Sequence, residues 1–371
     1  MNDKLKKLIY ITLGGFGILF LFLFLISSCS KRITPDKLES TIINNTKKYF
    51  SIHKDELPDI NSVMTLSLND LVNKGIIKDL DKLLEKNASC SGQLIIENNN
   101  NYYMYSPNLN CSYNGDEYKT NNLKETILKD IVTVGNGLHA LGDSYYYRGD
   151  NVNNYIIFDG ILWRITKINN DNTIRLIEAG RRTSVEWDNR YNSDRLSNSG
   201  INNYTNNGIN SIMKDLLDNI YNSETVLSNN AKGFIKPTNL CIGKRTTEET
   251  INDGSVECST VLENQYLGLI QINEYLLASL DPNCTKALAY ECSNYNYLAN
   301  FNNPYWSITA NIENNYQVYK ISNTISLTNA STSAMARLVI NISENTTVTG
   351  SGTENDPFVV SGFTNELKKI N

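Results

Sequence analysis

The most constraining feature of the chain is an uncharged, apolar stretch near its start. Residues 8–28 read LIYITLGGFGILFLFLFLISS, and the part from Leu8 to Ile26 is almost wholly apolar. As a helix this part would be about 28 Å long, close to the roughly 30 Å hydrocarbon core of a bilayer. Lysines precede it, and basic residues ahead of a first apolar segment favour a cytoplasmic N-terminus. We therefore expect residues 33–371 to be extracellular and held at the cell membrane.

Residues 1–32 would then be a cytoplasmic stub and an anchor. Three alternatives exist for this segment: a retained transmembrane helix, a lipoprotein signal, or a signal that is cleaved for secretion. The apolar run is longer than the core of an ordinary signal peptide, which favours a retained single-pass helix. Residues 26–29 (ISSC) resemble a lipobox, in which Cys29 would be acylated and become the N-terminus of a lipoprotein. Simple cleavage and secretion has little support, because no A-x-A-like site follows.

The cysteines indicate disulfides rather than a metal site. Setting Cys29 aside leaves six, an even number, in a chain that we expect to be exported. None of them are spaced as C-x-x-C and the only histidines are His53 and His139, so we predict no zinc site and no other metal. Other pairings of six cysteines stay open, but proximity along the sequence favours Cys90–Cys111, Cys241–Cys258 and Cys284–Cys292.

Length and charge exclude some classes of protein. The 371 residues allow two or three domains beyond the anchor. The net charge of -5 is mild and no lysine- or arginine-rich segment stands out, which argues against nucleic acid as a partner. We find no motif for a cofactor.

Residues 33–120 are expected to form a small α+β domain next to the membrane, with the role of a spacer. The pattern predicts a helix over 35–49, with Thr34 as its cap, and a short helix over 67–72. Two strands, at 93–97 and 102–105, flank a turn at 98–101.

Residues 121–142 read as a connector with a short helix at 124–131, and residues 143–362 as a β-rich domain. Residues 363–371 are left as a tail, and the overall class is α+β, mostly antiparallel. Helices are predicted at 209–221 and 273–278, and a polar surface loop at 241–258. The expected strands are 145–147, 155–158, 161–168, 173–177, 266–272, 306–309, 317–321, 324–327 and 337–342, with a last hairpin over 346–360.

Four strings in this second part carry a resemblance to a known family. They are YYYRGDNVNNYIIFDGILWRITKINNDNTIRLIE (145–178), LGLIQINEYLLAS (267–279), YWSITA (305–310) and ARLVINISENTTVTGSGTENDPFVV (336–360). In this order they resemble an uncharacterised domain of anchored surface proteins from low-GC bacteria. The YWSITA string and the closing strands are also similar to C-type-lectin-like domains of the formylglycine-generating-enzyme branch.

The resemblance implies an architecture and no reaction. A C-type-lectin-like fold often presents a ligand-binding face on its long loops, but a fold alone does not define a function. The formylglycine-type activity needs a reactive cysteine pair. The cysteines here have spacings that suit structural disulfide bonds, so we do not expect that activity.

No catalytic constellation is evident in the sequence. His53 and His139 fall in the spacer and the connector, away from any Ser/His/Asp arrangement. A carboxylate pair could still hydrolyse a glycan. The acids nearest to apolar strings are expected to be solvated loop residues: Glu178, Glu186, Asp188 and Glu274.

Three further features could contact a ligand. Arg148-Gly149-Asp150 is the known adhesion tripeptide, although Gly-Asp here also suits a tight turn. Residues 169–172 (NNDN) carry oxygen ligands but lack the spaced acids of a calcium loop. Trp163 and Trp306 are expected in the core, whereas Trp187 has polar neighbours and is our candidate aromatic ligand contact.

These observations favour a non-enzymatic surface protein for binding or adhesion, with a glycan or protein of the host or cell wall as its partner. An exported, carboxylate-dependent glycan hydrolase is the alternative from another class. A structural envelope protein is a third hypothesis.

Overall fold

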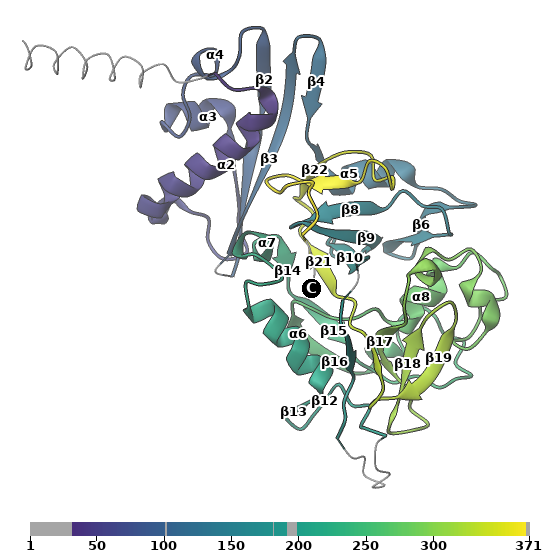
Figure 1. Ribbon diagram of the computed structural model, residues 1–371. Helices are drawn as coiled ribbons and strands as arrows, with labels where there is room; N and C mark the ends of the chain where they lie inside the picture. The colour runs from purple at the N-terminus through teal and green to yellow at the C-terminus, as the bar shows by residue number, and fades with distance from the viewer. Residues whose placement is uncertain (1–31, 101, 181, 191–198, 369–371) are drawn as a thin grey trace, which may run out of the picture.

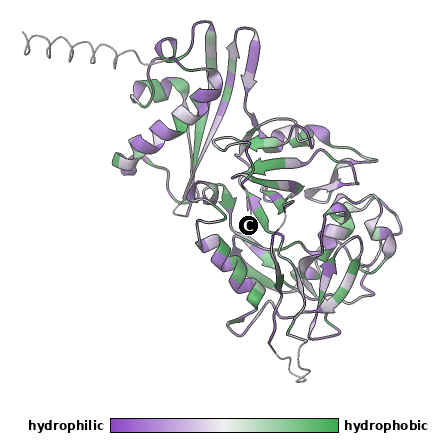
Figure 2. Cartoon of the chain, viewed as in Figure 1, coloured by the Kyte–Doolittle hydropathy of each residue, from purple (hydrophilic) through white to green (hydrophobic). Residues whose placement is uncertain are grey.

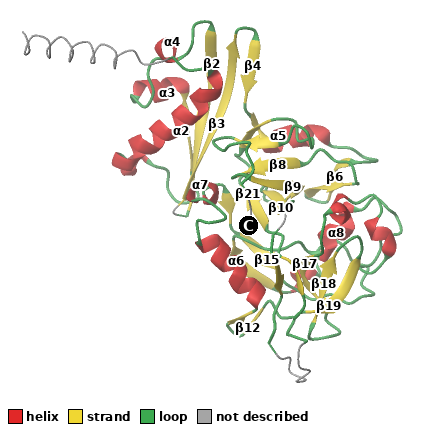
Figure 3. Ribbon diagram, viewed as in Figure 1, coloured by secondary structure: helices red, strands yellow, loops and turns green. Residues whose placement is uncertain are grey.

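A computed structural model describes residues 32–100, 102–180, 182–190 and 199–368. Within these residues no helix combines the length and apolarity needed to cross a bilayer. The predicted anchor, with Cys29, lies outside them. Strands and helices mix along the chain, and nearly all strand pairs are antiparallel, so the predicted α+β class is confirmed (Figure 3).

The first domain is a four-stranded antiparallel sheet with helices packed on one face (Figure 1). Its strand order is β1-β2-β3-β4. The strands are β1 Val63–Ser67, β2 Ala88–Asn99, β3 Tyr102–Tyr113 and β4 Asp116–Lys119. The helices are α2 Pro35–Ile52, the 3-10 turn Lys54–Glu56, α3 Leu68–Asn73 and α4 Leu80–Leu83.

Local sequence explains the two longer helices of this domain. Pro35 occupies the first turn of α2, where its missing N–H is not needed, and Leu38 and Ile42 place one face of α2 in the core. Figure 2 shows the corresponding alternation of apolar and polar residues along α2. Ser67 and Asp70 form a capping box at the start of α3, which satisfies two backbone N–H groups.

The long hairpin of β2 and β3 is shared by two hydrophobic cores. The sequence predicted shorter strands here, whereas twelve residues of each strand pair in register. Leu94 and Ile96 face the small core under α2. Ile95 and Met104 instead belong to the core of the second domain. The hairpin therefore contributes side chains to the cores of both domains.

The second domain is organised around a ten-stranded sheet, ordered β14-β21-β10-β9-β8-β23-β22-β5, with β7 beside β9 and β6 beside β7. Strands β8, β9 and β10 form the predicted meander, and the predicted closing hairpin is β22–β23. The bounds are β5 Asn121–Asn122, β6 Gly137–Leu141, β7 Ser144–Arg148, β8 Tyr155–Phe158, β9 Ile161–Ile168, β10 Ile174–Glu178, β14 Ile235–Lys236, β21 Val339–Ile342, β22 Thr347–Thr349 and β23 Phe358–Val360.

A five-stranded sheet of order β11-β20-β17-β18-β19 and three helices complete this domain. The sheet consists of β11 Ser184–Glu186, β17 Tyr305–Ala310, β18 Gln317–Ile321, β19 Ile325–Asn329 and β20 Ser333–Met335. The helices are α6 Ile212–Asn222, α7 Asn229–Lys232 and α8 Ile272–Ala278. Short elements are α5 Leu123–Ile127, β12 Thr205–Asn206, β13 Ile209–Asn210, β15 Thr238–Cys241, β16 Val261–Gln265 and the 3-10 turns Leu128–Asp130, Glu257–Ser259, Tyr290–Ser293 and Tyr297–Asn300.

Three stretches differ from the prediction. The expected connector, 121–142, supplies β5 and β6 to the large sheet. The expected strand at 266–272 is wrong: β16 ends at Gln265, and the apolar residues that follow are buried in irregular backbone. The expected tail packs on the domain, since the ring of Phe363 lies 5.0 Å from that of Phe158 and Lys368 pairs with Asp159 at 3.0 Å.

The domain interface contains a buried polar cluster around Glu97, near the end of β2. One Glu97 oxygen accepts from Lys236 Nζ at 2.5 Å, and the other accepts from Ser343 Oγ at 2.5 Å and Asn345 Nδ2 at 3.2 Å. Lys236 also donates to Asn99 Oδ1 at 2.6 Å. We call these five residues the interface cluster. Each carboxylate oxygen has a partner, as buried polar networks require.

Candidate functional site

The described part of the chain contains a polar cleft of about 730 Å³. Segments distant in sequence line it: Tyr146 on β7, the β9–β10 hairpin, residues 237–241 around the start of β15, residues 253–261, and the start of α8. Its volume falls within the roughly 300–1,000 Å³ typical of small-molecule sites.

The floor of the cleft carries two cations that share one carboxylate. Lys167 on β9 and Arg175 on β10 are directly opposite each other across the antiparallel pair, so both side chains project from the same face. Glu274 on α8 meets both: its Oε1 lies 3.0 Å from Lys167 Nζ and 2.7 Å from Arg175 Nε. The three side chains are largely buried, and together they carry one surplus positive charge.

Glu274 is held in its ionised form. Burial opposes ionisation, but Arg175 and Lys167 outweigh it and lower the pKa of the carboxyl to about 2. The second oxygen accepts from the Gln271 backbone N–H at 3.2 Å. A carboxylate with so low a pKa cannot act as a general acid near neutral pH.

Two buried polar groups at the floor lack hydrogen-bond partners among the described residues. Asn273 is 2 % exposed, and its Oδ1 accepts no hydrogen bond. Arg175 is 5 % exposed; its Nη2 has no partner and its Nε is close to Glu274 but poorly aligned. Its Nη1 makes a 3.4 Å contact with Asn341 Oδ1. Such groups are costly to bury and call for an explanation.

A second buried ion pair supports the floor from behind. Glu257 Oε1 accepts from Arg245 Nη1 at 3.0 Å and from the Asn273 backbone N–H at 3.1 Å, with both charged side chains fully buried. Burial raises the pKa of Glu257 against the opposing effect of Arg245. The expected polar loop at 241–258 is mostly irregular and partly exposed, but Arg245 and Glu257 are buried, so it is anchored through its interior and holds the backbone of Asn273.

The rim of the cleft carries two aspartates and lies beside a disulfide bond. Asp171 in the β9–β10 turn and Asp253 line the mouth, and hydrogen bonds from Ser255 lower the pKa of Asp253. The Cys241–Cys258 disulfide forms part of the wall. The expected turn at 169–172 is present, with Asn172 at a φ of 68° and Asp171 Oδ1 accepting from the Thr173 N–H. No group of three or more potential metal ligands occurs in the described residues.

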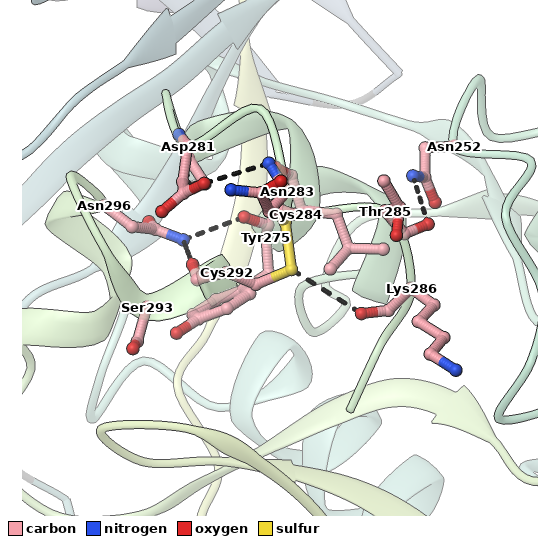
Figure 4. Close-up of a disulfide and its surroundings, with 12 residues drawn as sticks. Asn252, Tyr275, Asp281, Asn283, Cys284, Thr285, Lys286, Cys292, Ser293 and Asn296 are labelled. Atoms are coloured by element: carbon pink, nitrogen blue, oxygen red, sulfur yellow. Dashed lines mark hydrogen bonds between the residues drawn. A yellow bond between two sulfur atoms is a disulfide. The ribbon is translucent and has the colours of Figure 1, made fainter. Parts of the chain in front are cut away.

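All three disulfides predicted by proximity are present. Cys90–Cys111 joins β2 to β3, Cys241–Cys258 lies at the cleft, and Cys284–Cys292 staples the segment after α8. Figure 4 shows Asn296 beside this third bridge, where its Nδ2 donates to the backbone oxygens of Tyr275 at 3.0 Å and Cys292 at 2.8 Å. The staple and this amide fix the end of α8 to the following loop.

Trp187, predicted as an aromatic ligand contact, is instead a core residue. Its side chain is 0 % exposed and its ring centroid lies 6.0 Å from that of Trp306 and 5.9 Å from that of Tyr204. The polar residues next to it in sequence misled the prediction, because Asp188 beside it is also buried and pairs with Arg190. Trp163 and Trp306 are fully buried, as expected.

In the adhesion tripeptide, residues 148–150, the arginine side chain is engaged in hydrogen bonds within the protein. Arg148 ends β7, and its guanidinium donates to the backbone oxygens of Leu277 and Ser279, both at 2.8 Å. Asp150 is exposed in the turn after β7. The arginine therefore ties β7 to the end of α8, which is the structural alternative.

The acids that we expected to be solvated are mostly buried. Glu178 and Asp188 are 0 % exposed and Glu274 is 3 % exposed, each beside a cation. Glu186 alone is partly exposed, accepting from Asn189. Sequence reasoning named Glu274 but missed Lys167, Arg175 and Asn273, because only the fold brings α8 beside the predicted β9–β10 hairpin.

Comparisons with known proteins return nothing for this chain: no family model, no curated protein and no solved structure matches it. The resemblance to lectin-like surface domains therefore stays a prediction based on the four strings. The geometry of the cleft is the main guide to function.

Proposed function

We propose that the chain is a membrane-anchored extracellular protein that binds a ligand without transforming it, and that the polar cleft receives the ligand. The observation that carries this proposal is the polar lining of the cleft, where Arg175 and Asn273 also hold side-chain atoms that lack partners and are closed off from solvent. Unsatisfied buried groups call for an explanation, and for those beside the cleft we propose a ligand that completes their hydrogen bonds.

The extracellular location is supported by two independent features. The apolar stretch at 8–28 has the length of a bilayer span, and three disulfides suit an oxidising compartment. Protease added to whole cells should digest the part after the anchor. Protection of that part in intact cells, with digestion after lysis, would contradict the location.

For the second domain we keep the C-type-lectin-like fold as our proposal. Two mostly antiparallel sheets, with loop segments lining a cleft beside the larger one, are compatible with such a binding domain. An experimental structure of the full chain that superposes on lectin-like domains over both sheets would support it.

Glycan hydrolysis is the alternative that the cleft must be tested for. It needs a protonated carboxyl and a second carboxylate across the substrate. Glu274 is fixed as an anion by two cations, which leaves Asp171 and Asp253 at the rim. A glycan array and a hydrolysis assay on the full chain in detergent separate the two functions. We expect retention of a glycan without release of reducing ends; turnover abolished by Asp253→Asn would establish the enzyme instead.

The same two assays also have a third outcome, which would indicate a structural role in the cell envelope. A chain with this role would retain no member of the array and hydrolyse none.

A further inference from the structure

The charged groups of the cleft define the kind of ligand that it can hold. Four charged residues line it: Lys167 and Arg175 at the floor, and Asp171 and Asp253 at the mouth. Glu274, behind the floor, offsets one of the two cations. The floor therefore has one positive charge left, whereas the mouth is negative. This arrangement fits a ligand with a single anionic group at its deep end and repels polyanions at the entrance.

The geometry at the deep end favours a carboxylate. Arg175 Nε and Lys167 Nζ both lie beside Glu274 Oε1, so two kinds of cationic donor meet at one point. Arg175 Nη2 has no partner and is closed off from solvent, so a ligand reaches it when the side chain turns towards the cleft. A guanidinium pairs well with the planar oxygens of a carboxylate, and such hydrogen bonds are among the strongest in proteins.

The rest of the lining favours a saccharide over a peptide. Apart from Tyr146, Pro237, Val261 and the disulfide, the cleft is lined by amide, hydroxyl and charged side chains. Amides such as Asn273 and Gln271 both donate and accept, as ring hydroxyls do. The Asn273 Oδ1 atom in particular lacks a donor. A peptide would require apolar pockets for its side chains, which this lining does not provide.

We propose that the cleft recognises an acidic sugar residue, a hexuronic acid or a similar sugar carboxylate, with the carboxylate on Arg175 and Lys167 and a ring hydroxyl or N–H donating to Asn273 Oδ1. This inference deepens the function proposed above and rests on it. The negative charge of the ligand neutralises the surplus positive charge at the floor. One of its ring hydroxyls donates the hydrogen bond that Asn273 Oδ1 lacks.

A pair of isosteric ligands tests the charge requirement on the full chain in detergent. The probes are methyl glucuronide, which is acidic, and methyl glucuronamide, which is neutral, with acetyl-alanyl-alanine as a carboxylate without ring hydroxyls. By calorimetry the acidic sugar should bind at least about tenfold more tightly than either control, since each control lacks either the charged hydrogen bonds or the ring hydroxyls. Its affinity should fall with added salt.

Three variants place the binding in this cleft. Lys167→Gln should weaken the acidic sugar about tenfold and leave the glucuronamide unchanged, whereas Lys167→Arg should restore most of the affinity. Lys286→Gln removes a cation that pairs with Glu248 outside the cleft, and it should change nothing. Thermal unfolding of each variant checks that the fold is intact.

The outcomes separate this inference from the proposed function. Equal binding of the two sugars, or acid binding that Lys167→Gln does not alter, overturns the acidic-sugar site and leaves a binding protein in place. Binding of the dipeptide as tightly as the sugar overturns the saccharide class. If neither the probes nor any member of a glycan array is retained, the glycan-binding function fails as well.

Discussion

Two buried charged clusters in this protein have opposite characters. The interface cluster around Glu97 is balanced: one carboxylate meets one ammonium, and both carboxylate oxygens have partners. The cleft cluster, made of Lys167, Arg175, Asn273 and Glu274, has one cation too many and unpartnered atoms beside a cavity. A complete network stabilises the contact between the two domains, whereas the incomplete one beside the cleft is the basis of the binding function that we propose.

The largest effect should come from breaking the interface cluster. Glu97→Ala leaves Lys236 without its anion and Ser343 without an acceptor, and should lower the free energy of unfolding by about 3 kcal/mol. Urea unfolding followed by circular dichroism measures this change. Affinity for methyl glucuronide should stay as in the wild type. Glu263→Ala, on the exposed part of β16, is the matched control, and equal stability of the two variants would contradict a structural role for Glu97.

Two of the disulfides should separate stability from binding. The Cys241–Cys258 bridge closes a loop of 17 residues at the cleft, and Cys90–Cys111 closes one of 21 residues in the first domain. Replacing either pair with serines should lower stability by about 3 kcal/mol, because the unfolded chain gains freedom. We expect weaker sugar binding only for the pair at the cleft. Equal losses of affinity would show that the wall of the cleft is set elsewhere.

Acid should weaken the cleft cluster in a predictable pH range. Because the pKa of Glu274 is lowered to about 2, its ion pairs stabilise the fold above the unfolded pKa of about 4.5, and this contribution is lost as the pH falls towards 2. From pH 7 to pH 3 the loss should be about 2 kcal/mol. Glu274→Gln, which keeps the side-chain shape, should lack this component of the pH dependence. A variant that loses stability with acid as steeply as the wild type would place the titration elsewhere.

Glu274→Gln should also change the affinity of the cleft for an acidic sugar. Glu274→Gln removes the anion that offsets one cation, so the floor then carries two surplus positive charges. We expect tighter binding of methyl glucuronide and unchanged binding of the glucuronamide. Weaker binding of the acid would mean that Glu274 positions the cations rather than offsets them.

A smaller effect on stability is expected at Asn273. Its Oδ1 makes no hydrogen bond, so Asn273→Ala should change the free energy of unfolding by only about 1 kcal/mol. It should nevertheless weaken the acidic sugar and the neutral sugar alike, since both present ring hydroxyls. Full retention of affinity would remove Asn273 from the site.

The smallest effect is expected from a substitution in the adhesion tripeptide, residues 148–150. Asp150→Glu abolishes such a motif, but Arg148 is occupied by the carbonyls of Leu277 and Ser279. Attachment of host cells to immobilised protein should therefore be unchanged. A clear loss of attachment would show that Arg148 releases these carbonyls on binding.

Local rules predicted much of this fold and little of its site. The short helix over 67–72 and the disulfide partners depend on residues near each other in sequence, so their patterns are visible there. The apolar run 266–272 resembles a strand in sequence because burial alone produces the same pattern. Its backbone has a single bridge, Gly268 to Val339.

The cleft required long-range contacts that no local pattern contains. Lys167 and Arg175 could be paired once the β9–β10 hairpin was recognised, but Glu274 lies far along the chain on α8. Trp187 shows the opposite error, since polar neighbours in sequence do not expose a side chain that packs on Trp306. Burial of a charged residue beside its counter-ion is decided by the fold.

The most direct test of ligand binding in the cleft is a crystal structure of the full chain with methyl glucuronide bound. We predict the sugar in the cleft, with its carboxylate about 3 Å from the Arg175 guanidinium and the Lys167 ammonium, and a ring hydroxyl donating to Asn273. A sugar bound elsewhere on the molecule, with the cleft floor unchanged, would contradict this prediction.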